Sequence, residues 1–138
     1  IRSLHKNYIK YFKKKPRIAV LGLNPHNLEF KKNSEEVKTI LPVINILKKN
    51  YKIFGPYSSD TIFLKENLKN FDVIVGMYHD QVLAPFKALF EFDAVNITLG
   101  LPYIRMSPDH GVAKDKIKLK VSNPQSLNRC IDEMSRLT

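Results

Sequence analysis

Residues 76–111 are rich in polar side chains suited to binding a metal or an anionic substrate. This stretch carries two histidines, three aspartates, a lysine, an arginine and an asparagine between short apolar runs. Most of these residues follow an apolar run rather than lying inside one, which is typical of a binding site and not of a core. The pattern by itself predicts the mouth of an enzyme that acts on a small molecule.

Two histidines, His26 and His79, each follow a predicted strand. Imidazoles at two strand ends can approach one divalent cation, with Asp60 or Asp80 as a carboxylate ligand or as the partner of an imidazole. Either histidine could equally be an ordinary loop residue, because no HxxxH or CxxC spacing accompanies them. Both interpretations stay open on the pattern alone.

Positive charge near these histidines favours an anionic substrate. Arginine binds carboxylates and phosphates through paired hydrogen bonds, so Arg105 and Lys87 could hold such a group, or could be two surface cations. The turn Asp109-His110-Gly111 would let the backbone approach a ligand closely. The sequence has no GxGxxG motif and no P-loop, so a nucleotide would be held in another way.

Four short apolar runs are the strands that would position these residues, at residues 17–23, 51–54, 72–77 and 94–99. Because helical patterns separate them, we expect an α/β fold with a mostly parallel sheet and helices on both faces. Ligands bind outside the carboxyl ends of such strands. Each strand is followed within a few residues by a polar cluster, and all four clusters are therefore expected at one edge of one sheet. They are Asn24 with His26, Asp60 with Thr61, His79 with Asp80, and Arg105 with Asp109.

Two predicted helices precede the second strand. Residues 1–16 form a basic amphipathic helix that Pro16 ends, and it is expected to dock one apolar stripe on the domain rather than on a membrane. Asn33 and Glu36 have capping-box spacing at the start of the second helix. Pro42 inside that helix predicts a kink or a late start.

The last helix is expected to begin with Asn123 as its cap and Pro124 in its first turn. Cys130 lies in the apolar pattern of this helix, which predicts a small buried side chain. As the single cysteine of the chain it cannot form an internal disulfide, and a reducing cytoplasm fits.

The chain of 138 residues with 43% hydrophobic content fits one α/β domain over residues 1–138. It starts without methionine, so we expect a piece of a longer protein, and no apolar run is long enough to cross a membrane. We expect a soluble protein with no membrane partner.

The formal charge of +10 could indicate nucleic-acid binding. Seven of the 23 basic residues lie in the first 17 positions, and no RNA-binding aromatic motif, zinc-finger spacing or helix-turn-helix pair accompanies them. We therefore expect a solvated basic surface and no nucleic-acid partner.

Several ordered sequence words identify a family that the chain resembles. They are GLNPH (22–26), GP with SDTIF (55–56 and 59–63), MYHDQ with a later lysine (77–81 and 87), and NITLGLPYIR with SPDHG (96–105 and 107–111). Through them the chain resembles the C-terminal part of the 4-hydroxythreonine-4-phosphate dehydrogenases of pyridoxal phosphate biosynthesis. The resemblance covers nearly all of residues 17–113 and, more loosely, the rest.

The resemblance implies an oxidation of 4-phosphooxy-L-threonine that depends on NAD or NADP and on a divalent metal, Zn, Mg or Co. Decarboxylation to 3-amino-2-oxopropyl phosphate follows, on the route to vitamin B6. It also implies the fold of isocitrate and isopropylmalate dehydrogenases, only partly present here. The partner implied is a second copy, in a homodimer that shares its active site between subunits.

Residue roles carry over from the matching words. The resemblance implies that His26 and His79 are metal ligands, and that Lys87 and Asp80 are catalytic. The remaining roles are substrate binding by Lys87, Asn96 and Arg105, and cofactor binding by Asp109, His110 and Gly111.

Members of this family are much longer than this chain, and their N-terminal portion supplies a third metal histidine and further substrate contacts. No residue upstream of Arg17 matches these, so we expect a C-terminal fragment that is inactive, or nearly so, alone. Two alternatives stay open. One is a non-catalytic oligomerising or ligand-binding remnant, and the other is a phosphate acyltransferase of similar architecture that needs coenzyme A.

Overall fold

A computed structural model describes residues 1–25, 31–109 and 123–137 of the chain. The chain divides into two compact units. We call Lys13–Pro85 the parallel-sheet unit, and Ile1–Phe12 with Phe86–Thr138 the ribbon unit. Helix α4 (His79–Phe90) begins in the first unit and ends in the second.

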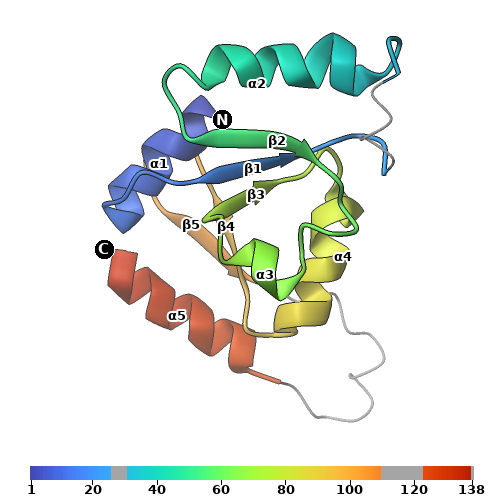
Figure 1. The fold of residues 1–138 in the computed structure, drawn as a ribbon. Helices are drawn as coiled ribbons and strands as arrows, with labels where there is room; N and C mark the ends of the chain where they lie inside the picture. Colours follow the sequence, from blue (N-terminus) through green and yellow to red (C-terminus); the bar gives the residue numbers. More distant parts are fainter. Residues whose placement is uncertain (26–30, 110–122, 138) are drawn as a thin grey trace. The chain divides into compact units, whose positions relative to one another are not determined.

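The parallel-sheet unit contains three parallel strands in the order β2-β1-β3 (Figure 1). A helical segment covers one face, and a short helix with the start of α4 lies on the other (Figure 1). The elements are β1 (Ile18–Leu21), η2 (Glu36–Ile40), α2 (Leu41–Leu47), β2 (Ile53–Tyr57), α3 (Lys65–Leu68) and β3 (Val73–Val75). The predicted parallel sheet with helices on both faces is confirmed.

Strand β1 is the centre of the core of this unit. All four of its residues are at most 5% exposed, as expected for a strand covered on both faces. Side chains alternate along a strand, so Ala19 and Leu21 share one face and belong to one buried cluster. Ile18 and Val20 point to the opposite face, where α2 buries Ile44.

The start of the second helix differs from the prediction. The capping box of Asn33 and Glu36 is wrong, because Glu36 turns inward and is 1% exposed. Instead, the Ser34 hydroxyl accepts the N–H of Val37 at 3.3 Å. The π-helix η2 leads into α2, which has Pro42 in its first turn, in agreement with a late start of the regular α-helix.

The ribbon unit contains a two-stranded antiparallel ribbon, β4 (Val95–Thr98) and β5 (Arg105–Pro108), with helices α1 (Arg2–Phe12) and α5 (Gln125–Leu137). The expectation that all four predicted strands lie in one sheet, with their carboxyl ends at one edge, is therefore wrong for β4. Residues 99–104 return the chain directly, with Gly100 at φ 94°. Such a short connection permits only antiparallel pairing, because parallel strands need a crossover of a dozen or more residues.

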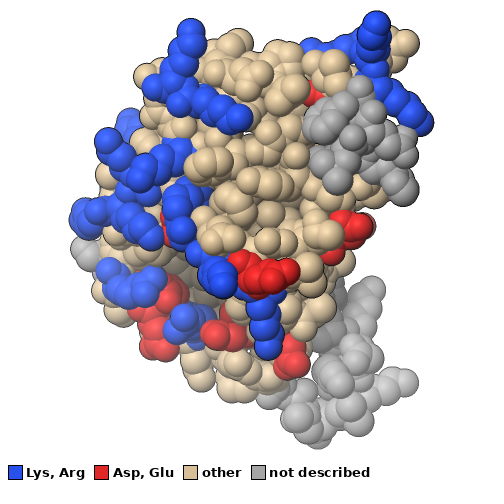
Figure 2. Space-filling model, viewed as in Figure 1, with Lys and Arg blue, Asp and Glu red and all other residues tan. Residues whose placement is uncertain are grey.

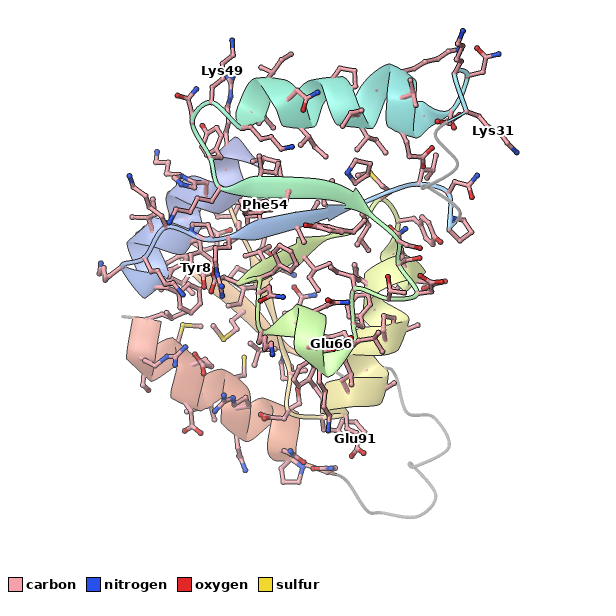
Figure 3. The ribbon with its side chains drawn as sticks, viewed as in Figure 1. Tyr8, Lys31, Lys49, Phe54, Glu66 and Glu91 are labelled. Carbon is pink, nitrogen blue, oxygen red and sulfur yellow. The ribbon has the colours of Figure 1, made fainter. Side chains whose placement is uncertain are left out.

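The two terminal helices largely follow the sequence. Asn123 Oδ1 accepts the N–H of Gln125 at 2.9 Å, and Cys130 is 7% exposed, so the predicted cap and buried cysteine are confirmed. Helix α1 ends at Phe12, before the predicted stop at Pro16. Tyr8, labelled in Figure 3, lies with its ring centroid 4.6 Å from that of Phe12.

Basic side chains project from both ends of the η2–α2 segment, where Figure 3 labels Lys31 and Lys49. Figure 2 shows Lys and Arg side chains standing out from the surface at these ends. Within the ranges that the structure describes, no helix has the length and apolar content needed to cross a membrane.

Gly55 allows β2 to bulge against β1. Ala19 pairs with Phe54 and Leu21 with Tyr57, so two residues of β2 lie opposite Val20. Gly55 has φ 124°, and a Cβ there would lie 2.3 Å from the carbonyl oxygen of Val20. Only glycine fits this conformation and this close approach.

We predict that Gly55→Ala lowers the free energy of unfolding by more than about 2 kcal/mol, because it adds a backbone clash to an unfavourable φ. Urea denaturation measures the loss. Gly100→Ala is the control, since φ is 94° there but the atom nearest to the added Cβ, Ser3 Oγ, is 3.6 Å away. Equal losses in the two variants would show that the carbonyl contact is not the constraint.

Asp72 joins the start of β3 to the start of β1. Its Oδ2 accepts the backbone N–H of Arg17 at 2.8 Å and Nε–H of Arg17 at 3.1 Å, and Oδ1 lies 2.8 Å from Lys14 Nζ. The side chain is 10% exposed. The hydrogen bonds from the Arg17 side chain, helped by Lys14, outweigh burial and hold the pKa of Asp72 well below its usual range.

A carboxylate with a lowered pKa in the folded state stabilises the fold above its unfolded pKa of about 4 and loses this effect as the pH falls. We therefore predict that Asp72→Asn lowers the free energy of unfolding at pH 7 by about 1–3 kcal/mol. The difference from the parent chain should shrink below about pH 4. Urea denaturation across this pH range measures it.

The control is Asp93→Asn, which removes a carboxylate that is 55% exposed and 3.2 Å from Arg129 Nε. Exposed pairs contribute little, so we expect a change of less than about 1 kcal/mol at each pH. A gap between Asp72→Asn and the parent that stays constant down to the lowest pH would contradict the assignment.

Candidate functional site

Gln81 ties the carboxyl end of β1 to that of β3. Its Nε2 donates to the carbonyl oxygen of Gly22 at 2.7 Å, and its Oε1 accepts the N–H of Met77 at 2.8 Å. The residue is 6% exposed, so both ends of a buried amide are satisfied by backbone. This side chain therefore fixes the spacing of the two strand ends, close to His79.

Ser58 connects the turn after β1 with the loop after β2. Its Oγ lies 2.8 Å from the carbonyl oxygen of Pro25 and 2.7 Å from Oδ1 of Asp60. Asp60 is one of the carboxylates expected at the site, and Pro25 directly precedes His26. The structure thus brings these two strand ends together, as the parallel topology predicted.

Glu36 fixes the same turn from the helical side. Its Oε1 accepts the N–H of Asn24 at 2.7 Å. Burial raises the pKa of Glu36, but the hydrogen bonds from Asn24 and from the Ser34 hydroxyl more than offset this, and the net pKa is lowered. An ionised carboxylate therefore holds the turn that leads to His26.

His79 and Asp80 begin helix α4 and face solvent. Nδ1 of His79 lies 2.6 Å from Oδ1 of Asp80, and the side chains are 77% and 85% exposed. A carboxylate at Nδ1 favours the proton there and leaves the Nε2 lone pair for a metal. Asp80 is therefore placed to orient the His79 ring and to fix its tautomer.

A complete metal site is not found in the described ranges, where no three His, Cys, Asp or Glu side chains are grouped to hold an ion. The predicted ligand His26 lies outside the described residues. The donor chemistry of His79 fits a divalent cation, and further ligands would have to join it.

The β4–β5 ribbon places two predicted substrate residues on one face. Asn96 pairs with Ser107, and Thr98 pairs with Arg105. Paired residues and alternate residues share a face of an antiparallel ribbon, so Asn96 and Arg105 lie on the same side. Both are exposed, and Arg105 Nη1 donates to Thr98 Oγ1 at 2.8 Å.

Lys87, on the second half of α4, meets Asp109 just after β5. Its Nζ lies 2.9 Å from Oδ2 of Asp109, with side chains 35% and 19% exposed. The N–H of Asp109 donates to Ser126 Oγ at 2.7 Å, and that hydroxyl donates to the carbonyl oxygen of Ala94 at 2.8 Å. A lysine expected to contact substrate is thus paired with a residue expected to contact cofactor.

The predicted residues therefore form two groups, one in each unit. The parallel-sheet unit carries Asp60, His79 and Asp80, and the ribbon unit carries Lys87, Asn96, Arg105 and Asp109. The predicted cofactor residues His110 and Gly111, like His26, lie outside the described residues.

Sequence reasoning assigned no role to Ser58, Gln81 and Ser126, and it placed Glu36 only in a helix cap. These four polar side chains hold the two groups in place. Gln81 stands in the MYHDQ word, which was the available indication of its importance. Each of the four has at least one partner that lies twelve or more residues away along the chain. No local sequence pattern predicts hydrogen bonds between such distant residues.

A family model described as "Pyridoxal phosphate biosynthetic protein PdxA" matches residues 1–134. The chain belongs to the PdxA family. The family resemblance of its sequence words is confirmed, and curated relatives named 4-hydroxythreonine-4-phosphate dehydrogenase agree. One from Aquifex aeolicus is 42% identical over 97% of this chain, and one from Prosthecochloris aestuarii is 50% identical over 72%.

The fold of a solved member of the family is also similar to that of this chain. A solved 4-hydroxythreonine-4-phosphate dehydrogenase from Klebsiella pneumoniae superposes with a TM-score of 0.77 at 33% identity over 99% of this chain. The chain covers 43% of that structure, and 43% and 30% of the two curated relatives. It therefore corresponds to part of a PdxA protein, as the sequence predicted.

We predict that Gln81→Leu lowers the free energy of unfolding by about 2–4 kcal/mol, because it removes the partners of the buried Gly22 carbonyl and of the Met77 N–H. Urea denaturation measures the midpoint and slope. Gln125→Leu makes the same chemical change at an exposed position of α5 and should have little effect. Similar losses for both variants would refute a special role for Gln81.

Proposed function

We propose that this chain supplies part of the active site of a dehydrogenase that oxidises 4-phosphooxy-L-threonine with decarboxylation to 3-amino-2-oxopropyl phosphate, in vitamin B6 biosynthesis. The match of the family model to residues 1–134 carries the proposal. Relatives that are 42% and 50% identical to this chain are named 4-hydroxythreonine-4-phosphate dehydrogenases.

We assign substrate binding to the ribbon unit. Arg105 offers a planar guanidinium that can hold a phosphate or carboxylate through two parallel hydrogen bonds. Asn96, on the same face of the ribbon, offers both an amide donor and a carbonyl acceptor. Lys87 offers an ammonium as a donor to a substrate oxygen. Together these residues suit a small substrate that carries negative charge and several oxygens.

His79 and His26 are the proposed metal ligands on this chain. The contact between His79 Nδ1 and Asp80 supports this role, because a ligating imidazole commonly donates its other N–H to a carboxylate. A bound divalent cation would polarise the substrate oxygen at which charge develops. Asp80 holds the His79 ring and its tautomer, and in this sense serves the chemistry.

NAD or NADP is the proposed hydride acceptor. His110, Gly111 and the backbone of Asp109 are the proposed contacts on this chain. We also propose that the whole enzyme is a cytoplasmic homodimer with its active site shared between subunits. The present chain would then contribute two metal-binding histidines but not a complete site, and would have little activity alone.

We predict that replacing His79 with alanine lowers the affinity of the chain for Co²⁺ or Zn²⁺ at least about ten-fold, because an imidazole ligand is lost. Asp80→Ala should weaken binding by about 10- to 100-fold through loss of the orienting carboxylate. Isothermal titration of the purified chain measures both affinities.

The control is His5→Ala, on α1, which should leave the isotherm unchanged. An unchanged isotherm for His79→Ala would refute the assignment of His79 as a metal ligand and would favour a non-catalytic remnant. Formation of NADH from the phosphorylated substrate by the isolated chain, at an ordinary enzyme rate, would refute the proposal that its site is incomplete.

A further inference from the structure

Lys87 is held twice by the same residue. Its Nζ lies 2.9 Å from Oδ2 of Asp109 and also donates to the backbone carbonyl oxygen of Asp109. An isolated ion pair near the surface has little energetic value and loose geometry. Two acceptors on one residue, one of them backbone, restrict the ammonium much more than a single carboxylate would.

Asp109 is itself anchored on its other side by Ser126. The backbone N–H of Asp109 donates to Ser126 Oγ at 2.7 Å, and the hydroxyl donates to the carbonyl oxygen of Ala94 at 2.8 Å. Ser126 is fully buried, with 0% exposure. A continuous set of hydrogen bonds therefore runs from the chain before β4, through the first turn of α5, to the ammonium of Lys87.

This arrangement changes what Lys87 can do. A lysine ammonium has three N–H donors. Among the described residues, Asp109 accepts two of them, which leaves one for another acceptor. The Asp109 carboxylate also balances the positive charge of Lys87. Arg105, by contrast, donates to the neutral hydroxyl of Thr98, so that contact leaves its charge free to attract an anion.

We propose that Asp109 is a positioning residue that makes Lys87 an oriented single hydrogen-bond donor, and that Ser126 fixes Asp109 for this task. The carboxylate of Asp109 thereby serves the substrate lysine rather than the cofactor. The proposal rests on the proposed function, in which Lys87 contacts substrate. It assigns attraction of the anionic group to Arg105 and alignment of one substrate oxygen to Lys87.

Nuclear magnetic resonance of lysine ammonium groups tests the geometry in the purified chain without any activity. In the parent chain, the Lys87 ammonium protons should exchange with water more slowly than those of Lys65, an exposed lysine on α3. Asp109→Ala should abolish the slow Lys87 signal, and Asp109→Glu should retain part of it. Asp93→Asn, which removes another carboxylate of the same unit, should leave it unchanged.

Exchange at Lys87 as fast as at Lys65 in the parent chain would overturn the proposal, whether or not any variant folds. Persistence of the slow signal in Asp109→Ala would overturn it too. Ser126→Ala provides a further test, because loss of the anchor for Asp109 should speed exchange at Lys87.

Steady-state kinetics of the full-length enzyme test the consequence. A misaligned donor should lower kcat/KM by roughly 10- to 100-fold in Asp109→Ala, mainly through kcat, with partial rescue in Asp109→Glu. Full activity of Asp109→Ala alongside a strongly impaired Lys87→Met would overturn the positioning role. An unimpaired Lys87→Met would instead overturn the proposed function, whatever the exchange measurement shows.

Discussion

Burial of β1 on both faces is the constraint on which the parallel-sheet unit depends. All four residues of this strand are at most 5% exposed, and it pairs in parallel with β2 on one side and β3 on the other. Parallel pairing brings the three carboxyl ends to the same edge. The polar residues that follow these strands are neighbours because an apolar strand is in the centre.

Buried polar side chains then convert this arrangement into defined positions. Gln81 spans two strand ends, and Glu36 holds the turn after β1. Each is almost completely buried and has backbone partners, and a buried polar group without a partner would be costly. By contrast, His79 and Asp80 are well exposed at the start of α4. The buried groups support the edge, and the exposed groups remain available to a ligand.

The ribbon unit organises its polar residues by a different rule. Antiparallel register places Asn96 and Arg105 on one face, and hydrogen bonds through Ser126 and Asp109 set the position of Lys87. Arg105 donates to the neutral hydroxyl of Thr98, whereas the Asp109 carboxylate balances the charge of Lys87. A site of this kind can separate attraction of an anion from alignment of the atom that reacts.

The sequence by itself determined the apolar strands, the Asn123 cap, the buried Cys130 and membership of the PdxA family, because periodicity, caps and ordered words are local. Only the tertiary structure decided that β4 pairs with β5, that Glu36 turns inward, and that Asp109 meets Lys87. These outcomes depend on strand pairing and on hydrogen bonds between distant residues. Several arrangements satisfy the same local pattern, and long-range packing selects one of them.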